Sequence, residues 1–349
     1  MAVLLTREAL ILAKSETTYG TDPTPTAAAN AILTTVPEVS LSVETKEREM
    51  VAGPSFSPNE PFYYGKSFDI NFSVEMRGFG TAYSTSDLPE AAPLLQACGF
   101  KQDLDATGGA EKVTYTLISD PVNATVSSGD TSSVNSCTIW LYWGGQLLKF
   151  NGCVGNMSFR GEMGGVPIAD FSFKGKYLPA NLDETEQSPH IPATVSYSST
   201  KPPFISSAVL TWDSTAVGCS KIEWGLNNEI NTLTTMASTN LDVERIYITG
   251  RAPAGSFDPV TLYEGDSNFL NYLGELEGNT SKAGLISIGS TQYERVKIGL
   301  GATIAGSGTR SKVSGVGFSD ANGHRAFEVA FAMYGSQGVG NNELEIVFD

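Results

Sequence analysis

The chain has 349 residues and a formal net charge of −16, from 22 Lys and Arg against 38 Asp and Glu. Such an acidic surface repels phosphate, which argues against tight binding to nucleic acid or to an anionic membrane. With 41% hydrophobic residues, 36 glycines and 17 prolines, the composition excludes a disordered chain and favours an all-β protein of about two domains.

The first residues contain only short apolar runs, interrupted by Arg7 and Glu8. A secretory signal or a membrane span requires a longer apolar segment, so we expect synthesis in the cytoplasm and no membrane partner. The sequence has four cysteines: Cys98, Cys137, Cys153 and Cys219. No CxxC pair occurs among them, which favours buried thiols in a reducing compartment.

The first half of the chain has the pattern of consecutive β-strands. Apolar and polar residues alternate over 39–44 and, most clearly, over 68–77, which predicts two half-buried strands. Between them, 45–66 combines charged residues, prolines and three consecutive aromatic residues, and its length predicts a functional loop. A proline near its start and a glycine at its end predict a helix over 88–99. Further strands are predicted at 113–118, 136–143, 146–161 and 167–177.

Residues 179–204 contain five prolines and no hydrophobic periodicity. This composition predicts a linker or an extended segment that crosses between domains. We therefore predict a first domain over 1–178, with an N-terminal arm, and a second domain over 205–349.

The second half repeats the order of elements in the first. A strand at 220–225, a polar loop at 226–242, a strand at 243–251 and a helix at 267–278 follow one another. Matching the alternation of the strands places Ile246 on Ile70, with further strands at 284–289, 294–306 and 326–335. The shared order predicts two copies of one β-domain.

No catalytic or metal-binding motif is evident. The two histidines, His190 and His324, lie in the linker and in a turn, and the sequence contains no GxSxG, CxxC or HExxH motif. The glycine-rich segment 299–306 lacks the GxGxxG spacing of a phosphate-binding loop. We expect no enzyme activity, no metal and no cofactor.

Three segments of the first half carry a resemblance to a known family. They read LLTREALILAKSETTYGTDPTPTAAANAIL, SLSVETKEREMVAGPSFSPNEPFYYGKSFDINFSVEMRG and LPEAAPLLQACGF. The chain resembles the tail tube (major tail) proteins of long-tailed, non-contractile bacteriophages, most closely over 1–178, and FSDANGHRAFEVAFAMYGSQG fits the same group. The resemblance implies a β-sandwich, and the second half is a departure from the single-domain members of the family. Together with the repeat, we expect two tandem, similar β-sandwich or β-barrel tail-tube-like domains, each with one short helix and a long inter-strand loop.

The resemblance further implies a structural virion protein in the phage tail. Its rings would stack into a tube that carries double-stranded DNA into the host. The residues expected to face the lumen are Ser40, Ser42, Glu44, Asp69, Asn71, Ser73 and Glu75. They follow from strand parity together with the resemblance, and parity alone leaves the opposite face open.

In this family the long loop reaches the neighbouring ring, which would be the role of 45–67 and of its counterpart 226–242. The residues expected to make this contact are Lys46, Glu47, Arg48, Glu49, Phe62, Tyr63, Tyr64, Asn228 and Glu229. An acidic lumen would let DNA slide through the tube instead of binding to it.

The duplication favours a homotrimeric ring with pseudo-sixfold symmetry over a homohexamer, in which the second half would be external decoration. The resemblance implies a tape measure protein, a tail terminator and distal tail proteins as further partners, and synthesis in the bacterial host cytoplasm.

Two alternatives share the composition. A capsid decoration protein would form isolated knobs without stacking. A carbohydrate-binding or adhesive β-sandwich would use exposed tryptophans as sugar platforms. The four tryptophans are Trp140, Trp143, Trp212 and Trp224, of which Trp143, before a Gly-Gly turn, is the best platform candidate.

Overall fold

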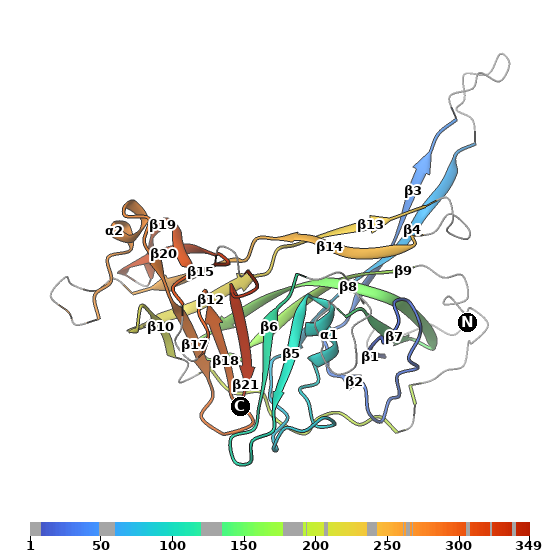
Figure 1. Ribbon diagram of the computed structural model, residues 1–349, viewed down its shortest axis with the longest axis horizontal. Helices are drawn as coiled ribbons and strands as arrows, with labels where there is room; N and C mark the ends of the chain where they lie inside the picture. The colour runs from blue at the N-terminus through green and yellow to red at the C-terminus, as the bar shows by residue number, and fades with distance from the viewer. Residues whose placement is uncertain are drawn as a thin grey trace.

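Nearly all regular structure in the chain is β-strand (Figure 1). The computed structural model describes residues 8–48, 60–119, 135–176, 191–192, 194–205, 209–235, 243–260, 262, 266, 268–304, 308–321, 323–336 and 340–349. The elements of the first half are β1 (Ala9–Ser15), β2 (Ala31–Ile32), β3 (Glu38–Lys46), β4 (Phe62–Glu75), α1 (Ala92–Ala97), β5 (Phe100–Asp105), β6 (Lys112–Leu117), β7 (Cys137–Trp143), β8 (Gln146–Glu162) and β9 (Ile168–Lys176). The prediction of an all-β protein is confirmed.

The second half contains two groups of strands on either side of a short helix. Its elements are β10 (Val209–Trp212), β11 (Thr215–Val217), β12 (Cys219–Gly225), β13 (Asn228–Leu233), β14 (Arg245–Arg251), β15 (Ala254–Pro259), α2 (Tyr272–Glu277), β16 (Ser281–Lys282), β17 (Gly284–Ile288), β18 (Val296–Leu300), β19 (Ser311–Ala321), β20 (His324–Met333) and β21 (Leu344–Phe348). Both predicted helices are confirmed, although each has only six residues.

Strand extends into both segments predicted as loops, 45–66 and 226–242, within the described residues. β3 continues to Lys46 and β4 begins at Phe62, because a bulge at Gly65, whose φ is +60°, lets the ladder resume beyond it. The segment 226–242 contains β13, which pairs with β14. Both pairs form hairpins, which we call the first arm (residues 43–48 and 60–66) and the second arm (residues 228–233 and 245–251).

The largest sheet has 12 strands and runs through both halves. One continuous run within it has the order β3-β4-β9-β8-β12-β15-β20-β19. A second sheet, β11-β10-β17-β18-β21-β6-β5, also joins the halves, through the pairing of β6 with β21. The division into domains 1–178 and 205–349 stays a prediction, since both sheets cross it.

The core extends without a break between the two halves. At the junction Phe159 of β8 stacks on Trp224 of β12, with ring centroids 5.6 Å apart. Both rings are buried, and they belong to one hydrophobic cluster that takes residues from both sheets. Of the cysteines, Cys98, Cys137 and Cys153 are buried and Cys219 is half-buried.

The pairing of the strands is repeated between the halves, residue by residue. Adding 185 to both numbers of the pair Val39–Ile70 gives the pair Trp224–Gly255. The same addition converts Thr45–Tyr63 of the first arm into Ile230–Ile248 of the second. The sequence match of Ile246 with Ile70 is therefore wrong, because the counterpart of Ile70 is Gly255, in a strand whose sequence, AGSFDP, does not alternate.

Candidate assembly surface

The seven residues expected in the lumen come from two adjacent strands and share one face. Ser40 of β3 lies opposite Asp69 of β4, and Asp69 lies opposite Lys174 of β9. The remaining five residues are Ser42, Glu44, Asn71, Ser73 and Glu75. The structure brings them together as a half-exposed to exposed polar face, while the alternate residues of β4 enter the core. Their place in a lumen stays a prediction.

Three basic side chains on this face are paired with acids. Lys174 Nζ lies 3.5 Å from Asp69 Oδ1, and Arg160 Nε lies 3.0 Å from Asp170 Oδ2. In the second half Lys221 Nζ lies 2.8 Å from Glu223 Oε1. Pairs this exposed contribute little to stability, but they cancel the positive charges that would hold phosphate.

The polar face continues across the junction of the halves. Arg160 of β8 lies opposite Glu223 of β12, and Glu223 lies opposite Ser256 of β15. Two shallow hollows lie on this face: one over β8, β12 and β15, and one that reaches Ser319 and Glu328. Eight consecutive strands, four from each half, thus carry polar residues on one face, and the second arm covers this face at Val154 and Asn156 of β8.

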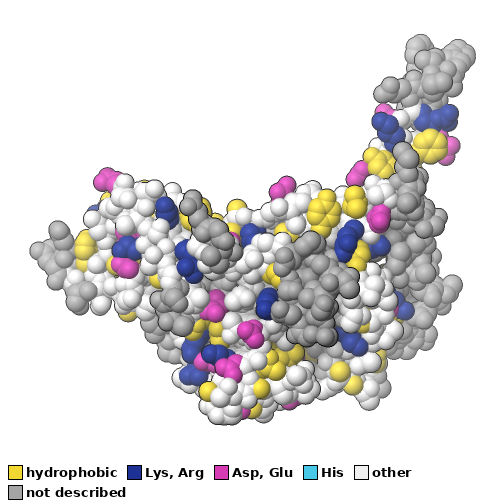
Figure 2. Space-filling model, in the orientation of Figure 1, with side chains coloured by type: hydrophobic (Ala, Val, Ile, Leu, Met, Phe, Trp, Pro, Cys, Tyr) yellow, Lys and Arg dark blue, Asp and Glu magenta, His cyan; other side chains and the backbone are white. Residues whose placement is uncertain are grey.

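The first arm projects away from the rest of the molecule (Figure 1). Its aromatic side chains Phe62 and Tyr63 are 59% and 60% exposed, and Figure 2 shows hydrophobic, basic and acidic side chains along it. Arg48 lies over the Phe62 ring, with its guanidinium carbon 5.8 Å from the ring centre. A hydrogen bond to Glu44 raises the pKa of Tyr64.

The other predicted loop residues of the first arm, Lys46 and Glu47, are exposed. Glu49 lies outside the described residues. The described inter-ring residues of the first half therefore lie on the projecting hairpin, and their contact with a neighbouring ring stays a prediction.

The second arm lies across β8 and β9 of the first half (Figure 1). Ile246 is buried in a cluster with Val154 of β8 and Ile118, and its backbone N–H donates a hydrogen bond to the Tyr19 hydroxyl at 2.7 Å. Burial raises the pKa of Tyr19. The second arm is therefore held within the chain.

The predicted contact residues of the second arm have different surroundings. Asn228 Nδ2 donates hydrogen bonds to the carbonyl oxygens of Cys98 (2.8 Å) and Gly155 (3.0 Å), whereas Glu229 is exposed. Sequence reasoning missed the packing residues of this arm, although the alternation in Arg245–Arg251 marks one apolar side.

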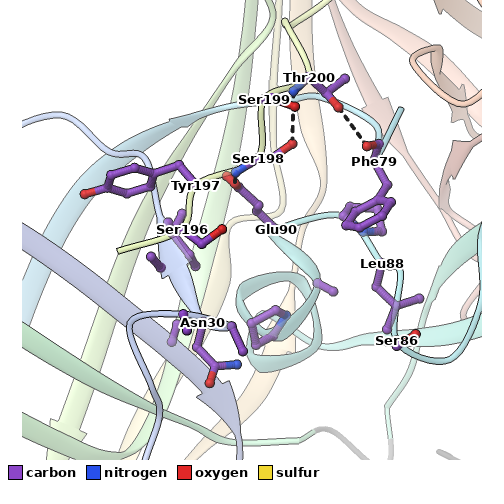
Figure 3. Close-up of a pocket in the computed structure, with 18 of the residues that line it drawn as sticks. Asn30, Phe79, Ser86, Leu88, Glu90, Ser196, Tyr197, Ser198, Ser199 and Thr200 are labelled. Carbon is purple, nitrogen blue, oxygen red and sulfur yellow. Dashed lines mark hydrogen bonds between the residues drawn. The ribbon is translucent and has the colours of Figure 1, made fainter. Parts of the chain in front are cut away.

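A cavity of about 590 Å³ lies beside α1, where residues 194–200 cross the first half (Figure 3). Glu90 accepts a hydrogen bond from the Ser198 backbone N–H at 2.6 Å, and its other oxygen lies 2.6 Å from Arg77 Nη2. The Thr200 hydroxyl donates to the carbonyl oxygen of Phe79 at 2.7 Å. Glu90 therefore anchors the crossing segment to the first half, directly and together with Arg77, which donates a hydrogen bond to the Thr200 carbonyl oxygen at 3.2 Å.

The tryptophans do not form the exposed platform that a sugar-binding module needs. Trp212 and Trp224 are buried in the core, which contradicts a platform role for these two. Trp140 and Trp143 are half-buried in β7, and Trp140 donates a hydrogen bond to Asp22 at 3.2 Å. The sequence prediction that Trp140 belongs to a regular strand is confirmed.

Other sites considered from the sequence add nothing to this surface. His190 lies outside the described residues, and His324 begins β20. Across the described ranges, no three or more His, Cys, Asp or Glu residues gather in a way that could hold a metal ion. In the same ranges, neither helix is long and apolar enough to span a membrane.

Comparison with known proteins gives one result that covers most of the chain. A family model described as phage tail tube protein matches residues 6–318, which include both arms, six of the eight strands of the polar face and most of a seventh, β19. A search of curated proteins found no match.

Proposed function

Because the chain belongs to the phage tail tube protein family, we propose that three copies form a pseudo-sixfold ring and that these rings stack into the tube of a long, non-contractile tail. The chain is a structural component of the phage tail tube. The ring size, the type of tail and the residues that make each contact are the proposal.

One observation carries the trimer: a single sheet contains the strand order β3-β4-β9-β8 and then its counterpart β12-β15-β20-β19. Each half supplies four strands and one arm. Three chains therefore supply six similar units, the same number as a ring of six subunits with one such unit each. A hexamer would need the second half to stand outside the ring, although its strands continue the same polar face.

The polar face of these strands is the surface we assign to the lumen. Its Arg160, Lys174 and Lys221 are each paired with an acid, which reduces their attraction for the phosphates of passing double-stranded DNA. Glu44 and Glu75 are exposed on it and add negative charge.

The first arm is the segment we assign to contact with the next ring. It projects from the body and carries the exposed aromatic side chains Phe62 and Tyr63. The ends of such a tube would meet the tail terminator and distal tail proteins, and its lumen would hold the tape measure protein during assembly.

The test is the mass of the purified protein in solution, followed by negative-stain imaging of the same fractions. Rings of three times the 37.0 kDa chain mass, with six similar units around a pore, are expected. Rings of six chains would overturn the trimer and keep the tube. A monomer that does not assemble when concentrated would contradict both.

A second test addresses the lumen. Glu75→Lys, outside the first arm and introduced into the phage, should leave tubes intact and slow DNA ejection, because it adds a cation on the proposed DNA path. Glu277→Lys, on α2 away from the polar face, is the matched control. Ejection at the wild-type rate in the Glu75→Lys phage would place Glu75 elsewhere.

A further inference from the structure

The two ends of the eight-strand run are open edges. Among the described residues, the strand that pairs with β3 is β4, which leaves the other edge of β3 unpaired there. On the far side of β19 from β20, β16 pairs only with Ser311 and Lys312, and no pairing in the described structure involves the edge of residues 316–321. These edges lie at opposite ends of the molecule (Figure 1). An unpaired edge is a template for another strand.

The junction inside the chain shows how two such edges fit together. The last five residues of β8 pair in antiparallel fashion with β12, with Phe159 opposite Trp224 and Ser158 opposite Gly225. β12 is the counterpart of β3, because Trp224 corresponds to Val39 at the offset of 185. In an equivalent junction between two copies, the edge of β3 would therefore take the place of β12.

The other partner is β19. Phe72, Phe171 and Met157 lie side by side across β4, β9 and β8. Their counterparts across β15, β20 and β19 are Phe257, Val329 and Val316. β8 ends five residues after Met157 and β19 ends five residues after Val316. Phe318 therefore corresponds to Phe159, and Gly317 to Ser158.

We propose that β19 of one copy pairs in antiparallel fashion with β3 of the next, with Phe318 opposite Val39 and Gly317 opposite Ser40. This seam between copies repeats the β8–β12 junction inside the chain. The inference rests on the proposed ring, for which it supplies the contact and its register.

Exposure of apolar side chains supports the seam. Phe159 and Leu226 are buried inside the chain. Their counterparts, Phe318 and Leu41, are 59% and 48% exposed. Both lie on the side of the sheet that faces the core, as the pairings of Phe318 with Phe327 and of Leu41 with Phe68 require. A second copy at this edge would bury them as the in-chain junction buries their counterparts.

The junction inside the chain and the seam between copies differ in charge. Inside the chain Arg160 lies beside Asp170 and opposite Glu223. At the seam between copies the corresponding residues are Ser319, Glu328 and Glu38, so β19 has an acid on either side of it and no arginine between them. The seam between copies is thus the weaker of the two, and an arginine at 319 should strengthen it.

The experiment is a disulfide cross-link in assembled tubes. In Ser40→Cys/Gly317→Cys the new thiols lie opposite each other on the polar face, and facing Cα atoms of an antiparallel pair lie within disulfide range. Oxidised tubes should give covalent two-chain and three-chain species on non-reducing gels. Leu41→Cys/Gly317→Cys, whose side chains point to opposite faces, and the single variants are the controls.

Three outcomes distinguish a failure of the proposed seam from a failure of the proposed ring. Cross-links that end at three chains support both. Tubes of the double variant that give no cross-links, or no more than the controls, overturn the register and leave the ring in place. Wild-type protein that never assembles contradicts the proposed function itself.

Two substitutions keep the test decisive if the cysteines prevent assembly. Phe318→Ser should raise the protein concentration needed for assembly about tenfold or more, whereas Met163→Ser, at a 74% exposed site outside the seam, should not. Ser319→Arg should lower the concentration several-fold at low salt and lose this effect at high salt. Unchanged assembly of both Phe318→Ser and Ser319→Arg would overturn the seam.

Discussion

The two arms have the same strand pairing and opposite surroundings. Thr45–Tyr63 and Lys46–Phe62 of the first arm correspond to Ile230–Ile248 and Asn231–Tyr247 of the second. The first arm continues the line of its sheet into solvent, whereas the second lies on the first half of its own chain. The same hairpin is thus free at one place and docked at another.

The bend of the second arm has a local cause. Asn227, with φ of +51°, interrupts the strand between β12 and β13, and Pro253 interrupts the other strand between β14 and β15. Proline cannot donate a ladder hydrogen bond, and a positive φ turns the chain out of the sheet. In the first arm the counterparts are Ser42 and Phe68, which stay paired in the ladder.

The two arms differ in the packing of their apolar side chains. Tyr247 and Ile248 pack against the cluster around Ile246, while their counterparts Phe62 and Tyr63 are exposed. Apolar residues are retained at positions that make contact in the second arm. We infer that the first arm makes its contact with another copy.

The largest effect should come from removing each arm in turn. Replacing residues 43–66 with an Asn-Gly turn joins the paired Ser42 and Ser67 by a two-residue hairpin. We expect a folded protein that forms rings and no tubes, measured by circular dichroism and negative-stain imaging. Normal tubes from this variant would exclude the first arm from stacking.

The matched replacement removes the corresponding residues 228–251. It should lower the melting temperature of the chain, because Ile118 and Val154 lose the side chains that bury them. An unchanged melting temperature would show that the second arm contributes nothing to the fold.

Single residues should show the same contrast on a smaller scale. Ile246→Ala should reduce the free energy of unfolding by about 2–4 kcal/mol, since it opens a cavity at a fully buried site. Tyr63→Ala should change it by less than about 0.5 kcal/mol and impair stacking instead. Urea unfolding of both variants tests this, and equal losses would remove the distinction between the arms.

The smallest effect concerns the hydrogen bond that holds the second arm. Tyr19→Phe removes the acceptor of the Ile246 N–H and should cost about 1 kcal/mol. Faster hydrogen exchange confined to the second arm would locate the loss, and exchange at the wild-type rate there would contradict it.

The same tyrosine predicts a pH dependence. Because burial raises the pKa of Tyr19 above its ordinary 10.0, the folded chain holds the phenolic proton more tightly than the unfolded chain. The free energy of unfolding should therefore fall as pH rises through about 10. Tyr19→Phe should fall less steeply above that pH, and parallel curves would show that Tyr19 does not contribute.

Strand alternation predicted which residues form the polar face. For the repeat it predicted that the elements recur, but not which strands correspond. Period 2 over 68–77 placed Asp69 and Asn71 on one side and Ile70 in the core, as found. The match of 243–251 to that strand failed, because β15 carries Gly255 where β4 carries Ile70. A glycine there fits because an added Cβ would meet Phe331 and Trp224, and such packing is invisible in a sequence.

The edges that form the proposed seam could not be found from sequence either. β19 follows a glycine- and serine-rich stretch and lacks strict alternation, because a register shift lies between Val313 and Gly315. The exposure of Phe318 identifies the edge only once strand order is known. Side-chain patterns specify faces, whereas edges depend on long-range pairing.

The crossing segment 194–205 has a consequence for association. By tethering β12 to the first half, it keeps the in-chain junction at an effective concentration in the millimolar range or above. The seam between copies has no tether and must offset the full loss of translational and rotational freedom on association. Substitutions at Phe318 or Leu41 should therefore be tolerated less well in virions than the same changes at equally exposed sites, although neither residue holds its own chain together.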